Sequence, residues 1–585
     1  MADHRDAVGG QRHVELDSID PERGRGAEPL QRILGKQASR AAMADQQGNG
    51  HAIASRDRGW RVKRLPHTHR GVIGLPLHLP EARLSDPVFD LLVIGGGING
   101  ACIGRDAAGR GLSVLLIEQD DLAGHTSSAS TKLIHGGLRY LEQGEFRLVR
   151  EALRERERLL AIAPHIIRPM EFVLPHAAGQ RPAALIRAGL FLYDHLARRR
   201  RLPASRALRF PPHPATAVLR ETLHRGFSYA DCWVEDSRLV VLNAMDAAER
   251  GARIRTRIRL IAARRADGIW QAELADGTTV AARAIVNAAG PWVGHVLTDR
   301  LGATPRRAVR LVQGSHIVVP RLHDGEYALL LQNPDRRVVF VIPYESRFSL
   351  IGTTDIPFTG DPARVQIGAK EVAYLCASLV PYLRVPPQPT DVVWSYAGVR
   401  PLYDDHASMA SEVTRDYVLD LDPTPGAPLL SVYGGKITTC RRLAEQAVTR
   451  LLAALGRPFV PPWTAKAPLP GGDTGADFIA WQADFIAAHG FLPAPLAARL
   501  ARTYGSRAAL LLAGASSLAD LGADLGGGLT ATEARYLVAH EFAMTAPDIL
   551  WRRTKLGLHA PAETEARLAA FLAAGGSTTG SDLLS

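Results

Sequence analysis

The chain has 585 residues and a mass of 63.2 kDa, and at roughly 100–200 residues per domain this length predicts two to four domains. Hydrophobic residues make up 46% and charged residues 22%, which excludes a collagen-like chain or one that is disordered throughout. The formal net charge of +11 does not by itself distinguish between nucleic acid, a membrane surface and anionic metabolites as partners.

Cysteine spacing and hydropathy exclude further classes of protein. Cys102, Cys232, Cys376 and Cys440 lie far apart and form no CxxC pair, which excludes a disulfide scaffold and a zinc ribbon and fits a reducing compartment. No run of about 18 apolar residues occurs, so we expect no transmembrane helix. We therefore expect a soluble or surface-bound intracellular protein.

Residues 1–86 differ from the rest of the chain. They show no sustained period of 2 or 3.6, and neither a signal peptide nor a transit peptide is evident. Two interpretations stay open: a disordered tail, or a start codon assigned too far upstream. The second is favoured because a regular pattern begins abruptly at Phe89.

A βαβ unit is predicted directly after this segment. Residues 89–94 form an apolar run typical of a buried parallel strand, and the sequence GGGING follows at 95–100. A helix of small residues is expected to end near Arg110, and residues 113–117 form a second apolar run that ends at Glu118.

The spacing of glycines in this unit is typical of dinucleotide binding. Gly95 allows the tight turn, Gly97 lets the backbone approach a pyrophosphate, and Gly100 lets the helix pack against the strand. Glu118 is positioned to accept hydrogen bonds from an unphosphorylated ribose. These features predict a dinucleotide cofactor without distinguishing FAD from NAD.

Two distant segments favour FAD. Residues 287–292 (NAAGPW) end a predicted strand with small side chains, and residues 434–439 (GGKITT) place a glycine pair before a helix expected near Cys440. A cofactor approached by the first and last thirds of the fold is long and buried. FAD fits this arrangement better than a dissociable nicotinamide cofactor.

Periodicity predicts further helices and strands along the rest of the chain. Residues 145–162 form an amphipathic helix, and the pattern from 253 to 352 indicates strands, with hairpin turns at 267–268 and 276–277. From about 465 the chain is rich in Ala and Leu at helical spacing, notably at 495–515 and 531–545. We predict a β-rich substrate domain in the strand region and a separate helical domain after it.

Several motifs closely resemble the FAD-dependent glycerol-3-phosphate dehydrogenases. The resemblance runs from about 89 to 570 and rests on segments 89–118, 126–141, 231–233, 287–292, 314–320, 351–355, 398–402, 434–439 and 551–555. It implies oxidation of sn-glycerol 3-phosphate to dihydroxyacetone phosphate, with the C2 hydride passing to flavin N5 and the electrons to a membrane quinone. The implied function belongs to glycerol and glycerol-3-phosphate catabolism.

The resemblance also implies an α/β fold and a domain plan. We expect a Rossmann-like FAD-binding domain with an inserted β-rich substrate domain, D-amino-acid-oxidase-like, followed by a helical C-terminal domain. The oxidoreductase region would span 87–464, with FAD-binding segments near 87–180, 225–300 and 390–464. The helical domain would span 465–574, and residues 575–585 would form a flexible tail.

Candidate site residues follow from the matched motifs. Arginine can pair two phosphate oxygens at once, so cations in these segments are candidates for the substrate phosphate. The candidates for substrate binding are Arg139, Tyr140, Arg400, Arg415 and Lys436. The candidates for FAD binding are Gly95, Gly97, Asn99, Gly100, Glu118, Ser127, Ser128, Ser130, Lys132, Ala289, Gly290, Gly435, Lys436 and Thr438. We expect no metal.

A base must accept the proton of the C2 hydroxyl as the hydride leaves. A neutral histidine suits this task, which makes His316 and His135 candidates. Alternatively, Arg400 would lower the pKa of the hydroxyl electrostatically. The base stays unassigned at this point.

Residues 182–210 contain a candidate membrane contact. An apolar helix opened by Pro182, with Leu185 and Phe191 among its apolar side chains, is expected to reach the basic cluster 198–201. A core helix with a solvated basic end is the alternative. The resemblance favours peripheral contact with the cytoplasmic face of the inner (cell) membrane, because a quinone is reached from the bilayer.

The sequence also bears on other partners and activities. We expect no nucleic-acid partner, since only 198–201 is densely basic and no recognition motif accompanies it. A homodimer is an open alternative. A flavin oxidase of the same fold, acting on glycerol phosphate with oxygen or on an amino acid, is the closest rival activity.

Overall fold

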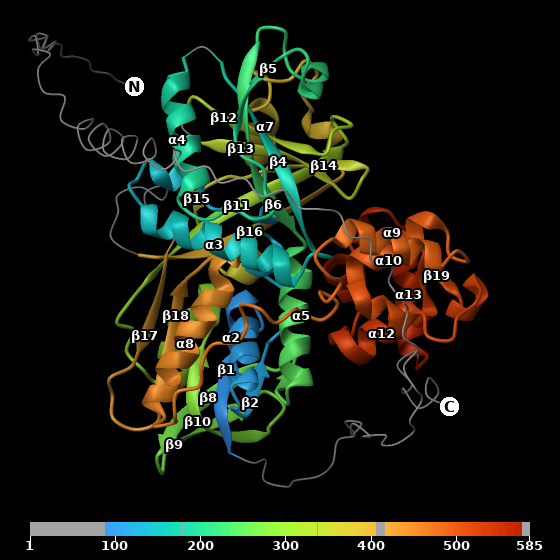
Figure 1. Cartoon of the computed structure of the whole chain (residues 1–585). Helices are drawn as coiled ribbons and strands as arrows, with labels where there is room; N and C mark the ends of the chain where they lie inside the picture. The colour runs from blue at the N-terminus through green and yellow to red at the C-terminus, as the bar shows by residue number, and fades with distance from the viewer. Residues whose placement is uncertain (1–87, 178, 336, 405–415, 576–585) are drawn as a thin grey trace, which may run out of the picture. The chain divides into compact units, whose positions relative to one another are not determined.

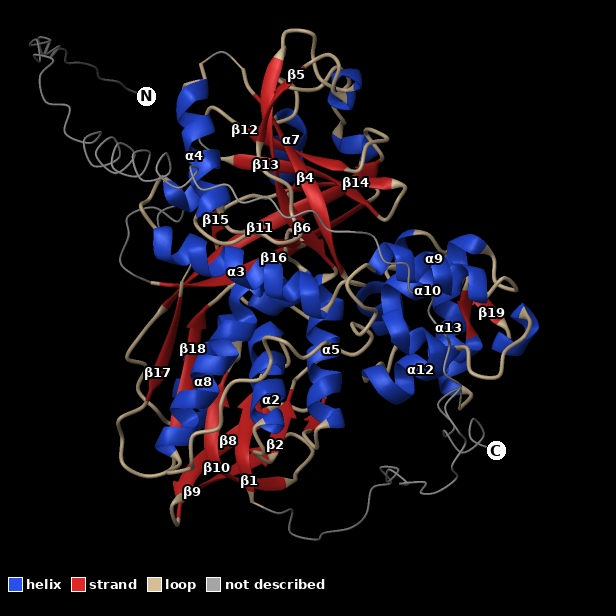
Figure 2. Cartoon of the chain, in the orientation of Figure 1, coloured by secondary structure: helices blue, strands red, loops and turns tan. Residues whose placement is uncertain are grey.

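The computed structural model describes residues 88–177, 179–335, 337–404 and 416–575. Their secondary structure comprises two large sheets with helices against them and a helical C-terminal domain (Figures 1 and 2). The predicted N-terminal extension at 1–86 and nearly all of the predicted tail lie outside the described residues.

The predicted βαβ unit is confirmed and lies at the centre of the first sheet. It consists of β1 (Phe89–Ile94), α2 (Ile98–Gly109) and β2 (Val114–Ile117), with β1 and β2 parallel. Along the main path of this sheet the order is β17-β18-β10-β1-β2-β7. The other strands of that path are β7 (Arg253–Arg255), β10 (Thr279–Asn287), β17 (Tyr417–Leu421) and β18 (Leu429–Gly434).

Alternate residues of β1 face two different cores, as expected of a strand buried on both sides. Leu91 and Val93 pack with the helices α2, α5 (Asp236–Glu249) and α8 (Cys440–Ala454). Leu92 and Ile94 pack on the opposite face, where Trp270 of β9 (Ile269–Leu274) is fully buried. The three helices lie side by side in Figure 1.

The hairpin turns at 267–268 and 276–277 are confirmed. Their strands lie in the first sheet, which agrees with the FAD-binding segment expected near 225–300 and not with a substrate domain over all of 253–352. β8 (Leu260–Ala266) pairs antiparallel with β9 (Ile269–Leu274), and β9 pairs with β10 of the first sheet. The region expected to form substrate-domain strands is thus divided at residue 287. The residue types favoured in hairpin turns predict each turn, but they do not predict which sheet the strands of the hairpin join.

The second sheet gathers strands from widely separated segments. Its main path is β15-β11-β14-β13-β12-β4-β6-β3, with β16 paired to β11 and β5 to β6. β4, β6 and β16 therefore lie in this sheet although they fall within the segments expected to bind FAD. The strands are β3 (Leu133–Ile134), β4 (Ile167–Pro175), β5 (Arg206–Arg209), β6 (Arg225–Val234), β11 (Val309–Pro320), β12 (Tyr327–Gln332), β13 (Val338–Tyr344), β14 (Phe348–Gly352), β15 (Ile356–Pro357) and β16 (Trp394–Tyr403).

Helices cover both faces of the second sheet. α3 (Phe146–Ile162), which confirms the predicted amphipathic helix, and α4 (Ala183–His195) pack with one face, and α7 (Ala369–Ala377) packs with the other. α4 begins after Pro182 as expected but ends at His195, before the basic cluster 198–201.

The C-terminal domain is helical and has its own core. Its helices are α9 (Phe478–Ala488), α10 (Ala494–Tyr504), α11 (Ala508–Leu511), α12 (Ala531–Glu541) and α13 (Thr564–Ala573), with a short hairpin β19 (Asp524–Gly526) and β20 (Leu529–Thr530). The helical pattern at 495–515 is divided between α10 and α11, and between them lies Gly505, whose φ is +55°. A Cβ there would lie 1.9 Å from the carbonyl oxygen of Gly471, so the two backbones can meet only through this glycine.

Candidate active site

The glycine turn after β1 has the close contacts that dinucleotide binding requires. A Cβ on Gly100 would lie 1.9 Å from the carbonyl oxygen of Gly95, so only glycine lets α2 approach the strand. Gly95 itself has a φ of +109° and lies against the carbonyl of Ala288. The turn and the N-terminus of α2, where Gly97 is the N-cap, therefore form a narrow backbone cradle.

Glu118 closes one side of this cradle. Its buried carboxylate accepts hydrogen bonds from the N–H of Gly96 at 2.6 Å and of Asp120 at 3.0 Å. Burial raises the pKa of Glu118 above its usual value, against the lowering effect of these two N–H groups. The acidic side chain is thus held at the turn by the backbone.

Ser127 and Asn99 border the same cradle. Ser127 Oγ accepts a hydrogen bond from the N–H of Ile98 at 2.9 Å, and Asn99 Nδ2 donates to the carbonyl of Gly434 at 3.2 Å. Asn99 Oδ1 is buried and has no hydrogen-bond partner among the residues that the structure describes. Gly435 follows with a φ of +101° and faces the Asn99 side chain. An unsatisfied buried acceptor beside a glycine-lined cradle fits a bound dinucleotide that carries hydroxyl donors.

The hydroxyl-rich segment 127–132 is held by an acidic partner. Lys132 Nζ lies 2.7 Å from Asp236 Oδ1, and both side chains are fully buried. Ser130 Oγ donates to the other oxygen of Asp236 at 2.8 Å, whereas Ser128 Oγ donates to the carbonyl of His125. The Lys132 ammonium is therefore engaged within the protein, and its role toward FAD stays a prediction.

The segment after β10 places small residues at the turn. Ala289 precedes a short helical turn at Gly290–Trp292, and Gly290 has a φ of +56°. The ring of Trp292 meets that of His125 edge to face, with centroids 4.8 Å apart. The sequence had indicated the small residues but not this aromatic contact.

A second group of candidates lies around the short turn Leu138–Leu141. Lys436 Nζ lies 4.0 Å from the centre of the Tyr140 ring, and the hydroxyl of Thr438 accepts from the N–H of His135 at 3.3 Å. Within the described part of the chain the guanidinium of Arg139 makes no hydrogen bond or ion pair. The turn Leu138–Leu141 and the segment after β18 therefore lie next to each other, and together they carry the positive charges of Arg139 and Lys436.

Arg400 lies on β16, a strand that contacts the start of the hydroxyl-rich segment expected to bind FAD. Thr126 Oγ1 donates to the carbonyl of Val399 at 2.7 Å. Arg400 itself forms an ion pair with Asp355 and donates to Thr353 Oγ1 at 2.6 Å. A side chain on Gly314 would collide with this guanidinium, so the glycine leaves room for it.

His316 is fully buried beneath Tyr396. Their rings stack with centroids 4.8 Å apart, and His316 Nε2 lies 3.0 Å from Thr131 Oγ1. Burial, followed by the positive charges of Arg400 and Lys132, lowers the pKa of His316 well below its usual value. Its imidazole is therefore neutral at physiological pH.

His135 is neutral as well but only half-buried. Burial is the largest cause that lowers its pKa, opposed by the charge of Asp231 and supported by those of Lys436 and Arg156. The remaining candidate, Arg415, lies outside the described residues. Asp236 and Tyr396 are missed as site residues because no local pattern marks them. Thr131, Thr353 and Asp355 lie in the matched segments 126–141 and 351–355, but no role is predicted for them.

Two protein-family models match the chain. Residues 90–441 match the model described as FAD dependent oxidoreductase, and residues 462–578 match the C-terminal domain of alpha-glycerophosphate oxidase. The chain belongs to the FAD-dependent oxidoreductase family. It is an enzyme that uses FAD, and the predicted fold class is confirmed.

Curated relatives indicate members of this family to which the chain is similar in sequence. A glycerol-3-phosphate dehydrogenase of Pseudomonas aeruginosa is 54% identical over 503 residues, which cover 85% of this chain and 97% of that protein. A D-erythritol 1-phosphate dehydrogenase of Brucella abortus is 51% identical over 489 residues, 83% of this chain and 97% of that protein. The predicted similarity to the glycerol-3-phosphate dehydrogenase group is confirmed, and the group includes an enzyme named for another phosphorylated polyol.

A solved structure supports the cofactor. The glycerol-3-phosphate dehydrogenase of Bacillus halodurans, complexed with FAD, matches with a TM-score of 0.65 at 27% identity and covers 85% of this chain and 92% of that one. The cradle formed by Gly95, Gly100, Glu118 and Asn99 is the part of the present structure that fits this cofactor.

Proposed function

We propose that this enzyme oxidises sn-glycerol 3-phosphate to dihydroxyacetone phosphate. FAD, when bound in the cradle, would accept the C2 hydride at its N5 atom, and a protein base would take the hydroxyl proton, which balances a two-electron oxidation of the alcohol. The observation that carries the proposal is the set of three cations, Arg139 and Lys436 on turns and Arg400 on β16, in segments that adjoin the cofactor cradle. It is supported by relatives named as dehydrogenases of phosphorylated polyols.

Three cations are proposed to bind the substrate phosphate. The guanidinium of the half-buried Arg139 makes no hydrogen bond or ion pair with the described residues, and Lys436 lies over the ring of the adjacent Tyr140. Arg400 is held by Asp355 and Thr353, which fixes the direction of its planar fork. Such a set favours a phosphate dianion and disfavours an amine substrate, because an ammonium would be repelled.

His135 is the histidine we propose as proton acceptor. It is neutral, half-buried and adjacent to the Lys436–Thr438 segment, so a hydroxyl bound there would lie beside an imidazole able to accept a proton. For His316 we propose a positioning role. It is buried beneath Tyr396, is hydrogen-bonded to Thr131, and lies on β11, the strand that pairs with the strand of Arg400.

A membrane quinone is proposed as the acceptor of the electrons. Within the part of the chain that the structure describes, no helix combines the length and apolar content needed to span a bilayer. On α4, however, Leu185 and Phe191 are 51% and 49% exposed, and the basic cluster 198–201 follows. Exposed apolar side chains next to arginines suit peripheral contact with an anionic leaflet.

D-erythritol 1-phosphate is the second candidate substrate, because a relative of similar identity is named for it. Steady-state assays with an artificial electron acceptor would compare kcat/KM for the two phosphorylated polyols, with glycerol as the unphosphorylated control. We expect the higher value for sn-glycerol 3-phosphate and no measurable turnover of glycerol. A higher value for D-erythritol 1-phosphate would replace the substrate, and equal rates with glycerol would overturn phosphate recognition.

A further inference from the structure

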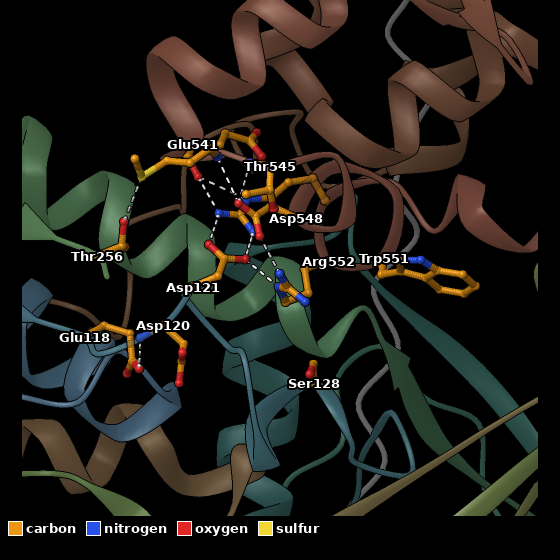
Figure 3. A network of polar contacts seen from close by, with 12 residues as sticks. Glu118, Asp120, Asp121, Ser128, Thr256, Glu541, Thr545, Asp548, Trp551 and Arg552 are labelled. Atoms are coloured by element: carbon orange, nitrogen blue, oxygen red, sulfur yellow. Dashed lines mark hydrogen bonds and ion pairs between the residues drawn. The ribbon is translucent and has the colours of Figure 1, made fainter. Parts of the chain in front are cut away.

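The C-terminal domain contacts the loop that contains Glu118. The loop runs from the end of β2 through Asp120 and Asp121 to Gly124, whose N–H donates to the carbonyl of Asp121. Figure 3 shows the side chains of Asp121, Arg552 and Asp548 turned toward one another, with Glu118 and Asp120 on the adjoining turn. The turn at Asp548–Arg553 belongs to the C-terminal domain.

Asp121 is held by two consecutive arginines. Arg553 donates from Nη1 and Nη2 to the two carboxylate oxygens at 2.7 and 2.8 Å, and Arg552 Nε donates to one of them at 2.5 Å. The side chains of Arg553 and Asp121 are 0% and 2% exposed. A bidentate pair excluded from water fixes the direction of both groups.

The neighbouring residue Asp120 is tied to the same turn by a second route. Its carbonyl accepts from the N–H of Arg257, and the guanidinium of Arg257 reaches Asp548 at 2.8 Å. Asp548 also accepts from Arg552. Both residues of the loop are thus anchored to one turn of the C-terminal domain, through different partners.

The anchored loop contributes directly to the cofactor cradle. The N–H of Asp120 donates to Glu118, which in turn accepts from the N–H of Gly96 in the glycine turn. The N–H of Ala123 donates to the carbonyl of Gly96 at 3.2 Å. A displacement of Asp121 would therefore move the groups that hold Glu118 and Gly96.

We propose that Arg553 and Arg552 are positioning residues for FAD: by gripping Asp121 they hold the Glu118 loop in its cofactor-binding arrangement. Binding of FAD and docking of this turn then stabilise each other, since coupling between two sites is reciprocal. The C-terminal domain, for which the sequence indicates no chemistry, acquires a role in retaining the cofactor.

The test measures FAD binding rather than turnover. Asp121→Asn keeps the shape of the side chain but removes its charge, and Arg552→Gln is a milder change because Arg552 is 20% exposed. The matched control is Glu541→Gln, which weakens another buried ion pair between the domains, with Arg238. Among the described residues, the Glu541 side chain makes no hydrogen bond or ion pair with the loop, and its carbonyl, which accepts from Arg553, is retained in this variant. Each apoprotein would be titrated with FAD, and its melting temperature recorded with and without FAD.

We expect the dissociation constant of FAD to rise at least tenfold in Asp121→Asn and about threefold in Arg552→Gln, but less than twofold in Glu541→Gln. The FAD-induced rise in melting temperature should shrink in the same order, and the KM for substrate of the FAD-saturated variants should stay within twofold. Equal losses of FAD affinity in Asp121→Asn and Glu541→Gln would overturn the proposal, as would unchanged affinity in both Asp121 and Arg552 variants. If Asp121→Asn does not fold, Arg552→Gln against Glu541→Gln decides alone.

Discussion

The ammonium of Lys132 lies 2.7 Å from Asp236 Oδ1, and neither side chain has any exposed surface. The pair joins the hydroxyl-rich segment 127–132 to the first turn of α5, and Asp236 also accepts from Ser130. An unpaired charge would remain buried if either partner were removed, so this contact stabilises the loop on which the cofactor segment depends.

Lys132→Met should therefore destabilise the protein strongly. Leaving the Asp236 carboxylate buried without its partner costs about 3–5 kcal/mol in comparable cases. Denaturant unfolding of the apoprotein, followed by circular dichroism, would measure the loss. A change below about 1 kcal/mol would show that the pair contributes little.

Gly100→Ala and Gly104→Ala offer a comparison within one helix. A Cβ at 100 would lie 1.9 Å from the Gly95 carbonyl oxygen, whereas a Cβ at 104 meets Leu116 at an ordinary 3.6 Å. We expect Gly100→Ala to be purified without FAD. Gly104→Ala should retain FAD and be as stable as the parent, or more stable by about 0.5–1 kcal/mol, because alanine is the better helix former. The FAD-to-protein absorbance ratio distinguishes the two outcomes, and equal ratios would contradict the account of the glycine turn.

Arg400→Gln should lower kcat/KM for the phosphorylated substrate about a hundredfold, which corresponds to about 2.7 kcal/mol. Arg384→Gln, at an exposed arginine near Glu221, serves as the control and should change kcat/KM less than twofold. Both proteins should bind FAD normally. A loss of FAD in Arg400→Gln would indicate a structural role for the arginine in place of phosphate binding.

The stability of the enzyme should fall with acid below pH 6.5. His165 is fully buried, and burial, with the charge of Arg238, lowers its pKa to about 3. Between pH 6.5 and about 3 the unfolded chain binds a proton at this residue that the folded protein does not, so the free energy of unfolding decreases as pH falls. The contribution is about 1.4 kcal/mol per pH unit. His165→Gln should reduce the slope by that amount over this range, and an unchanged slope would contradict a buried neutral imidazole.

Membrane contact through α4 can be tested with charge substitutions. Leu185→Glu combined with Phe191→Glu should abolish flotation with vesicles that contain phosphatidylglycerol, because both exposed apolar side chains are lost. Ile479→Glu, at a 64% exposed residue of α9, is the matched control and should float normally. Equal flotation of all variants would exclude this helix as the contact.

Local patterns predicted the elements well, but not the partners that assemble the site. Residues 89–118 were predicted because strand, glycine turn and helix are neighbours in sequence. Asp236 was missed because it lies 104 residues from Lys132, and the Asp121–Arg553 contact joins residues 432 apart. Likewise, the hairpins of 253–287 were recognised by their turns, while their pairing with the first sheet depends on the tertiary packing of Trp270 and its neighbours.

The proposed function requires that a phosphorylated polyol reduce the bound FAD. The most direct measurement is anaerobic: the visible spectrum of the purified holoenzyme is recorded before and after addition of sn-glycerol 3-phosphate. We predict that the flavin band bleaches, returns on addition of a quinone analogue, and returns only slowly in air. A flavin band that is unchanged by both sn-glycerol 3-phosphate and D-erythritol 1-phosphate would contradict the proposed function.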